Sequence, residues 1–122
     1  MIVRKHHVGI ATNNLEAEIK KYETAGFKLD KRFAKPGMKA AMLFKDEAGV
    51  ELFEFENPDG KQEQMIKQHT AYVSDDLEKD IDDYVKRGCE LAIPITKGTI
   101  TKRFAYVKDP VGTYIELLEP LD

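Results

Sequence analysis

The chain has 122 residues, of which 42% are hydrophobic and 34% are charged, and its formal net charge is −3. This composition is typical of an ordinary globular protein, and the mixture of both charges argues against a dedicated nucleic-acid surface. No apolar run approaches the ~20 residues that a membrane-spanning helix needs. The opening MIVRKHHV is too short and polar for a signal peptide, and the single cysteine, Cys89, suits a reducing compartment, so we expect a cytoplasmic location.

The first predicted element is a strand at about residues 3–12. Its alternation places Val8 and Ile10 on one face and His7 and Ala11 on the other. The strand therefore carries one apolar face and one face with a histidine.

A helix is expected next, at about residues 15–25. Leu15, Ile19 and Tyr22 form one apolar stripe at helical spacing. Asn13, three residues before a glutamate, resembles an N-terminal cap, and Gly26 is well placed to end the helix in a left-handed conformation.

Three strands and a connector complete this first unit. The strands are predicted at about residues 28–33, 40–45 and 50–56, with turns at residues 35–37 and 46–49. Residues 57–68 begin with Asn-Pro-Asp-Gly and continue as a polar run, so we interpret them as a connector. The first unit is thus β-α-β-β-β.

The second half of the chain repeats the first. Residues 7–29 align without a gap with residues 69–91, at a constant offset of 62 positions. Identical residues stand at seven aligned pairs: His7/His69, Leu15/Leu77, Glu16/Glu78, Ile19/Ile81, Tyr22/Tyr84, Gly26/Gly88 and Leu29/Leu91. Such internal similarity predicts two copies of one structural unit.

The second copy repeats the structural signals of the first. Asp75 is the expected cap, Leu77 starts the apolar stripe, and Gly88 is the expected stop. Strands are predicted at about residues 90–93, 103–108 and 113–118, with a hairpin turn at 109–112. We therefore predict an α+β fold with two βαβββ modules in tandem, at about residues 1–58 and 69–122. They would form a single domain whose mixed sheet curls around a cleft.

Each half also supplies one histidine and one Glu-Leu pair. VELFE at residues 50–54 reappears as IELLE at residues 115–119. A lone strand histidine is more often structural than a ligand. The duplicated set, however, suits a divalent metal ion such as Ni, Co, Zn, Mn or Fe, with two positions left for water or substrate. The candidate ligands are His7, Glu51, His69 and Glu116, and His6 is the rival of His7 if the strand register slips by one residue.

The chain resembles the vicinal oxygen chelate superfamily, which contains glyoxalases, bleomycin-resistance proteins and extradiol dioxygenases. The resemblance covers about residues 5–120, through HVGI at residues 7–10, GVELFE at 49–54, His69 with its strand, and DPVGTYIELLEP at 109–120. It places the family's four metal ligands on the four candidates above. It also implies a cleft around the metal, a small-molecule substrate with vicinal oxygens, and a homodimer.

The resemblance is nearest to glyoxalase I (lactoylglutathione lyase), which isomerises the hemithioacetal of a 2-oxoaldehyde and a thiol. It implies that the chain is a metal-dependent lyase or isomerase that moves a proton through an enediolate. Glu116 would be the base, with Glu51 as the second candidate. The alternatives are an acyl-CoA epimerase or a ring-cleaving dioxygenase on the same site. A different class is a drug- or metabolite-binding resistance protein without catalysis.

Two positions depart from the pattern of bacterial glyoxalase I. Ala11 stands where an arginine meets the glutathione carboxylate, and Phe55 stands where an asparagine is typical. Lys97 lies near a loop that contacts an anion in the family. The predicted substrate pocket is therefore formed by Ala11, Phe53, Phe55 and Lys97, and it suits glutathione poorly.

Several other polar and aromatic side chains are expected to be structural. Glu54 and Glu119 are out of phase with the ligands and should be solvated. Tyr106 is expected in the core. The acidic run around Asp80 should form a solvated helix face.

Overall fold

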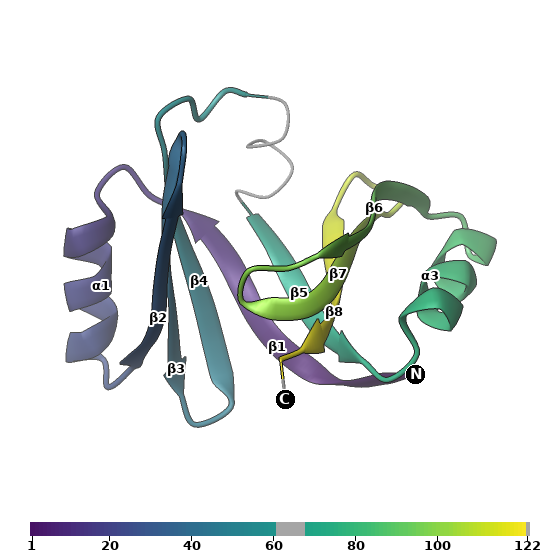
Figure 1. Ribbon diagram of the computed structural model, residues 1–122, viewed down its shortest axis with the longest axis horizontal. Helices are drawn as coiled ribbons and strands as arrows, with labels where there is room; N and C mark the ends of the chain where they lie inside the picture. Colours follow the sequence, from purple (N-terminus) through teal and green to yellow (C-terminus); the bar gives the residue numbers. More distant parts are fainter. Residues whose placement is uncertain (61–67, 122) are drawn as a thin grey trace. The chain divides into compact units, whose positions relative to one another are not determined.

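The computed structural model describes residues 1–60 and 68–121, and its residues cluster into two compact units. One unit is Met1–His6 with His69–Asp122, and the other is His7–Gln68. Figure 1 shows the elements in chain order. They are β1 (Ile2–Ala11), α1 (Leu15–Thr24), β2 (Lys28–Lys35), β3 (Met38–Lys45), β4 (Ala48–Phe55), β5 (Gln68–Ser74), α3 (Leu77–Lys86), β6 (Glu90–Lys97), β7 (Thr101–Lys108) and β8 (Tyr114–Pro120).

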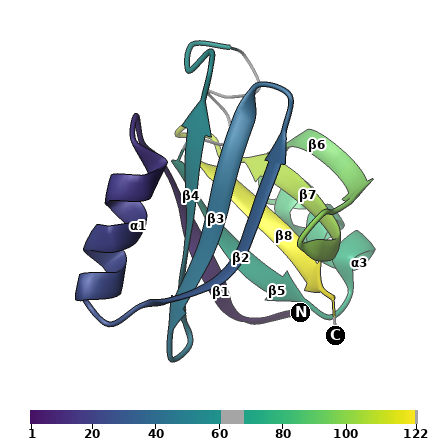
Figure 2. The ribbon, with the colours of Figure 1, turned by 60° about the vertical axis from the view of Figure 1, so that its left-hand side comes forward.

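The two modules have the same strand arrangement. In the first, β3 pairs antiparallel with β2 and β4, and β1 pairs parallel with β4. In the second, β7 pairs antiparallel with β6 and β8, and β5 pairs parallel with β8. The strand order is β2-β3-β4-β1-β5-β8-β7-β6, and β2, β3 and β4 lie side by side in Figure 2. The predicted α+β class with two βαβββ modules is confirmed.

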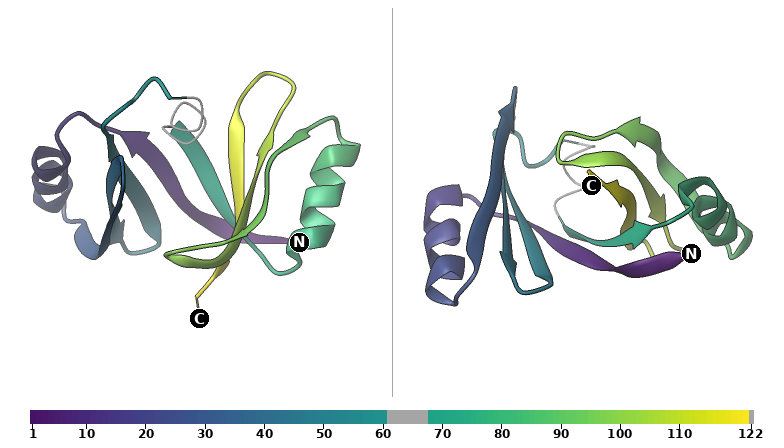
Figure 3. Two further views of the ribbon diagram at one scale, coloured as in Figure 1. Left: turned by 45° about the horizontal axis from the view of Figure 1, so that its top comes forward. Right: turned by 60° about the horizontal axis from the view of Figure 1, so that its bottom comes forward.

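Helix α1 covers one face of its own sheet, as α3 does in the second module (Figure 3). The apolar stripe predicted for α1 makes this contact: Leu15 and Ile19 are each 2% exposed. They pack on Ala41, Leu43, Val50 and Leu52, with Val8, Ile10, Tyr22 and Phe27 around them. Because side chains alternate along a strand, residues 40, 42, 51 and 53 take the other face of this sheet.

The N-cap residue of each helix lies one position after the predicted one. Asn14, not Asn13, accepts a hydrogen bond from the backbone N–H of Ala17 at 3.1 Å. Asp76, not Asp75, accepts one from the N–H of Lys79 at 3.2 Å. Two adjacent residues of the same type precede each helix, so the sequence alone does not separate them. The predicted glycine stops are confirmed, because Gly26 and Gly88 have φ of 98° and 102°.

Strand β6 is longer than expected, continuing past Ile93 to Lys97. Pro94 lies inside it, where the pairing with β7 shifts register between Ile93 and Thr96. A proline is tolerated at such an irregularity on an edge strand, because its missing N–H is not needed there. The proline therefore interrupts the pairing without ending the strand.

Glu54 and Glu119 were predicted to be solvated, and their side chains are half-buried, at 27% and 22% exposure, with charged partners. Glu54 Oε1 accepts the N–H of Leu15 at 2.8 Å, and its other oxygen pairs with Lys39 at 3.2 Å. Glu119 is bound by Arg103, whose Nε and Nη2 lie 2.7 and 2.8 Å from the two carboxylate oxygens. Both glutamates therefore stabilise the outer face of their sheets.

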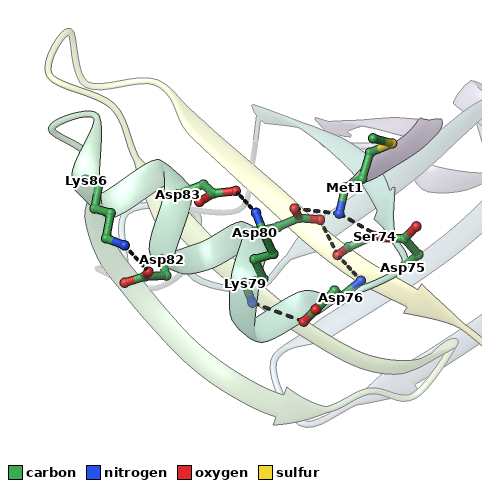
Figure 4. Close-up of polar contacts among 9 residues, drawn as sticks. All are labelled: Met1, Ser74, Asp75, Asp76, Lys79, Asp80, Asp82, Asp83 and Lys86. Carbon is green, nitrogen blue, oxygen red and sulfur yellow. Dashed lines mark hydrogen bonds and ion pairs between the residues drawn. The ribbon is translucent and has the colours of Figure 1, made fainter.

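The expectation of a solvated acidic face on α3 is wrong at Asp80, which is 4% exposed. Figure 4 shows why. Ser74 Oγ donates to Asp80 Oδ2 at 2.5 Å, and the amino group of Met1 lies 2.8 Å from Asp80 Oδ1. The same amino group lies 2.7 Å from Asp75 Oδ1, and these two carboxylates raise its pKa through hydrogen bonds. A buried carboxylate of α3 thus binds the amino group of Met1, the residue before β1.

The predicted connector is described only in part. Residues 57–60 form bends and a turn, and the remainder of the predicted connector, residues 61–67, lies outside the described residues. Among the described residues, neither helix has the length and apolar character that crossing a membrane requires.

The cap assignment gives a direct test. Asn14→Ala should lower the free energy of unfolding by about 1 kcal/mol, because it leaves a helix N–H without its side-chain acceptor. Asn13→Ala is the matched control and should change it by less than about 0.5 kcal/mol, as at an ordinary surface position. Urea unfolding of the two variants and the wild type measures both. Equal losses in the two variants would contradict the cap assignment.

Arg103 gives a test with a defined pH dependence. Hydrogen bonds from Arg103 hold the pKa of Glu119 and of Glu78 below their usual range. A lowered carboxyl pKa in the folded state stabilises the fold above the unfolded pKa of about 4.3, and this stabilisation is lost as the pH falls through the folded value. The stability difference between wild type and Arg103→Met should therefore be largest near neutral pH and shrink below about pH 4.

Lys102→Met is the control for this experiment, since it removes a like charge from the neighbouring position of β7. Urea unfolding across the pH range should show a smaller and flatter difference for Lys102→Met. A difference for Arg103→Met that grows on acidification would overturn the argument.

Candidate metal-binding residues

The first candidate pair lies on the two parallel strands of the first module. Gly9 of β1 is the direct partner of Glu51 of β4, and His7 lies two residues earlier on the same face. His7 Nε2 and Glu51 Oε1 are 3.1 Å apart, and the two side chains are buried, at 1% and 7% exposure. His7 and Glu51 therefore share one face of this sheet, because side chains alternate along both strands.

The second pair repeats this geometry in the second module. Ala71 of β5 is the direct partner of Glu116 of β8, with His69 two residues earlier. His69 Nε2 and Glu116 Oε1 are again 3.1 Å apart, and the side chains are 0% and 7% exposed. The partner of each glutamate is a glycine or an alanine, so little bulk separates imidazole from carboxylate. The internal repeat therefore extends to the strand register and to the distance between the two polar groups.

Tyr106 belongs with the second pair, and the sequence did not indicate it. The prediction that it is buried is correct, at 4% exposure. Its hydroxyl, however, donates to Glu116 Oε1 at 3.2 Å and lies 3.3 Å from His69 Nε2. The hairpin turn at residues 109–112 could have revealed this contact, because pairing outward from that turn sets Tyr106 opposite Glu116.

His6 was the rival candidate if the strand register had slipped. It is half-buried, whereas His7 is fully buried and pairs with Glu51. Val8, which faces the same way as His6, packs toward helix α1. The register is therefore the expected one.

The predicted pocket residues of the first module form a contiguous apolar group. Ala11 of β1 is the direct partner of Phe53 of β4. The rings of Phe53 and Phe55 stack with centroids 5.6 Å apart and planes 7° apart. Met38 and Ala40 pack with them, as does Phe33. These side chains share the face of Glu51, so an apolar wall adjoins that carboxylate.

Lys97, the fourth predicted pocket residue, belongs to the other compact unit. It is exposed at the end of β6 and pairs with Arg103 in the sheet register. Its place in a pocket with Ala11 stays a prediction.

The chemistry of the two pairs fits a divalent cation. Each of the four residues is buried and offers one ligand atom, an imidazole nitrogen or a carboxylate oxygen. Two imidazoles and two carboxylates match the donor preferences of Ni, Co, Zn, Mn and Fe. Buried carboxylates are costly without a partner, and a cation would compensate for that cost.

Comparison with known proteins agrees with a divalent metal site. The family model for the glyoxalase/bleomycin resistance protein/dioxygenase superfamily matches residues 4–117. The chain belongs to this superfamily. No curated protein sequence matches the chain.

Solved structures of the superfamily and of uncharacterised proteins share the fold. Methylmalonyl-CoA epimerase from Mycobacterium tuberculosis has a TM-score of 0.83 and 23% identity, covering 99% of this chain and 90% of that chain. A hypothetical protein from Bacillus halodurans C-125 has a TM-score of 0.81 and 21% identity, covering 98% and 95%. The 2,3-dioxygenase LapB from Pseudomonas sp. KL28 has a TM-score of 0.67 and 20% identity, covering 97% of this chain and 42% of that chain.

Membership of the superfamily indicates a divalent metal ion as cofactor. It also allows more reactions than that of glyoxalase I. The superfamily is dependent on divalent metal ions, and the buried imidazoles and carboxylates agree with the predicted divalent metal cofactor. Superfamily members include metal-dependent epimerases and dioxygenases that act on small molecules. The narrower likeness to glyoxalase I, and the four residues as one ligand set, stay predictions.

Proposed function

We propose that the chain is a metal-dependent isomerase or lyase of the glyoxalase I type. His7, Glu51, His69 and Glu116 would together hold one divalent ion, and the substrate would bind through two adjacent oxygens. The single observation that carries this proposal is the duplicated buried pair. In each module a histidine nitrogen lies 3.1 Å from a glutamate oxygen, at equivalent positions of parallel strands.

The number of carboxylates supports proton transfer over oxygen chemistry. Two histidines with one carboxylate are the usual set of non-haem iron oxygenases, whereas this chain has a buried glutamate in each module. A second carboxylate provides a group that can accept a proton while the other ligands remain in place. A non-catalytic binder needs no such group.

The chemistry then follows from the residues. When bound, the metal ion acts as a Lewis acid that acidifies the C–H bond beside a chelated carbonyl. Glu116 or Glu51 accepts that proton as general base and returns it to the neighbouring carbon as general acid. The histidines keep their ligand atoms in place, because both residues are buried, at 1% and 3% exposure.

The substrate we propose is a hemithioacetal of a small 2-oxoaldehyde with a thiol other than glutathione. Ala11, Phe53 and Phe55 give the first module an apolar wall next to Glu51, where a charged thiol substituent would lose hydration without a partner. Lys97 would provide one anion contact. We also propose that the chain acts as a homodimer.

The second candidate is an acyl-CoA epimerase, and the symmetry of the two pairs favours it. Epimerisation needs one base to remove a proton and another acid to return it from the opposite side of the same carbon. Two equivalent His–Glu pairs provide two such carboxylates. Both candidates use the same proton chemistry and differ in where the proton returns.

Metal content tests the ligand set. The purified protein should contain a divalent ion at close to one per chain. His7→Ala and His69→Ala should each lower the metal affinity by more than the ~10–100-fold that an outer-shell partner contributes. His6→Ala is the matched control, since it removes a neighbouring imidazole from the other face of β1. Elemental analysis and competition with a chelator give both quantities.

Two results would contradict the ligand set. One is a metal-free native preparation that binds aromatic ligands tightly, which would indicate a non-catalytic binder. The other is a His69→Ala variant that keeps the metal affinity of the wild type.

Substrate choice tests the reaction type. Glutathione adducts should be poor substrates, and adducts of smaller thiols without a carboxylate should be converted to 2-hydroxyacyl thioesters. In deuterated water, exchange during the transfer should place solvent deuterium at carbon 2 of the product. Ala11→Arg should raise kcat/KM for the glutathione adduct, by about 10-fold for a ~1.4 kcal/mol charge-assisted contact. Ala11→Leu controls for the added bulk.

Other substrates separate the alternatives. Epimerisation of a 2-methyl-branched acyl-CoA thioester without any hemithioacetal turnover would favour the second candidate. Oxygen consumption with a catechol would replace both candidates by a ring-cleaving dioxygenase.

A further inference from the structure

The two His–Glu pairs differ on the third strand of each module. In the antiparallel pairing, Met42 of β3 is the direct partner of Glu51, and Tyr106 of β7 is the direct partner of Glu116. The two positions are equivalent in the repeat, because each faces the glutamate from the adjacent strand. Both side chains are buried, at 2% and 4% exposure. The duplication is therefore broken at one buried residue beside each carboxylate.

Tyr106 and Met42 differ in their ability to donate a hydrogen bond. A tyrosine hydroxyl is a hydrogen-bond donor, whereas a methionine thioether is only a weak acceptor. Tyr106 uses its hydroxyl on Glu116 Oε1, at 3.2 Å. Met42 has no hydrogen to donate to Glu51. Only one of the two carboxylates thus has a hydroxyl donor at this position.

Tyr106 is itself held in place by aromatic contacts. Its ring meets the His69 ring edge to face, with centroids 5.1 Å apart and planes 70° apart. The Phe104 ring lies on another side, with centroids 5.9 Å apart and planes at 90°. A buried ring packed in this way has few alternative rotamers, so its hydroxyl can fix the carboxylate that it contacts.

We infer that Tyr106 makes the two carboxylates unequal in function: it fixes Glu116 as a permanent ligand and leaves the proton transfer to Glu51. This inference rests on the proposed function and assigns its base. Tyr106 is a positioning residue, because it acts through Glu116. The assignment also reverses the sequence-based expectation, in which Glu116 was the favoured base.

The proton balance of this assignment is complete. Glu51 accepts the proton from the carbon beside the chelated carbonyl, and the electron pair of the broken C–H bond moves onto the carbonyl oxygen. Glu51 then returns the proton to the former carbonyl carbon. At the same time the hydroxyl group of the first carbon becomes the new carbonyl, and its proton passes to the oxygen of the former carbonyl. No oxidant or reductant is required. The apolar wall of Phe53 and Phe55 on the same strand would place the substrate beside Glu51.

The first test removes the hydroxyl. Tyr106→Phe should lower the metal affinity by about 10–100-fold, as loss of an outer-shell partner does, and should shift the visible spectrum of the cobalt-substituted protein. Tyr72→Phe is the matched control, because Tyr72 of β5 faces the opposite side of the sheet from Ala71 and Glu116. It should leave the affinity and the spectrum unchanged. Wild-type affinity and spectrum in Tyr106→Phe would overturn the inference.

The second test compares the two glutamates in the wild-type background, so it does not depend on Tyr106→Phe folding. Glu51→Gln should keep most of the metal and lose about 10²–10⁴-fold in kcat with little change in KM. Glu116→Gln should lose metal affinity to a greater degree than Glu51→Gln does. The reverse order of the two variants would overturn the inference. A wild-type protein without metal would instead refute the proposed function, so the two failures are distinct.

Discussion

The contact on which the candidate site depends is the one between an imidazole and a carboxylate on neighbouring parallel strands. It occurs twice, at the same 3.1 Å separation and at equivalent registers. Parallel pairing sets residues of the two strands side by side, and the pleat turns His7 and Glu51 toward the same face. The small partner residues, Gly9 and Ala71, allow the two polar groups to meet. A different register in either module would separate imidazole from carboxylate.

Burying a carboxylate is unfavourable, and this explains which residues surround it. A carboxylate removed from water needs a charged or hydrogen-bonding partner. The helix side of the first sheet is apolar at its core, as Leu43 and Leu52 show at 0% exposure. On the helix side of the second sheet the buried carboxylate of Asp80 has Ser74 and the amino group of Met1 as partners. The buried carboxylates of Glu51 and Glu116 likewise each have a histidine as partner.

The sequence was sufficient for the fold and for the His–Glu pairs, because both follow from periodicity and repetition. Alternation gave the faces of β1 and β4, and helical spacing gave the buried stripe of α1. It was insufficient where the outcome depends on a choice between neighbours, as at the caps Asn14 and Asp76. It also failed where a long-range contact decides burial. Asp80 is buried because it binds Ser74 and the amino group of Met1. Ser74 precedes α3, and Met1 is remote from it in the sequence, so the helical periodicity of α3 indicates neither contact.

The contact between Tyr106 and Glu116 was missed for a different reason. The hairpin turn that sets these two residues opposite each other was itself predicted from the sequence. Periodicity indicated burial, and a buried tyrosine is ordinarily a packing residue. Its polar function appears only when the residue directly opposite is considered. In a duplicated protein, equivalent positions that carry different residues are therefore as informative as those that carry the same residue. Met42 and Tyr106 are such a pair, because they face Glu51 and Glu116 with different chemistry.

The division of β1 between the two compact units has a consequence for any separation of the two halves of the chain. Met1–His6 groups with the second half of the sequence, while the strand continues from His7 into the first half. A gene fragment encoding residues 69–122 alone would lack the strand segment that completes its sheet. Separate expression of the halves would therefore yield unequal polypeptides, whereas a circular permutant that begins at β5 would keep the segment, because β1 would follow β8.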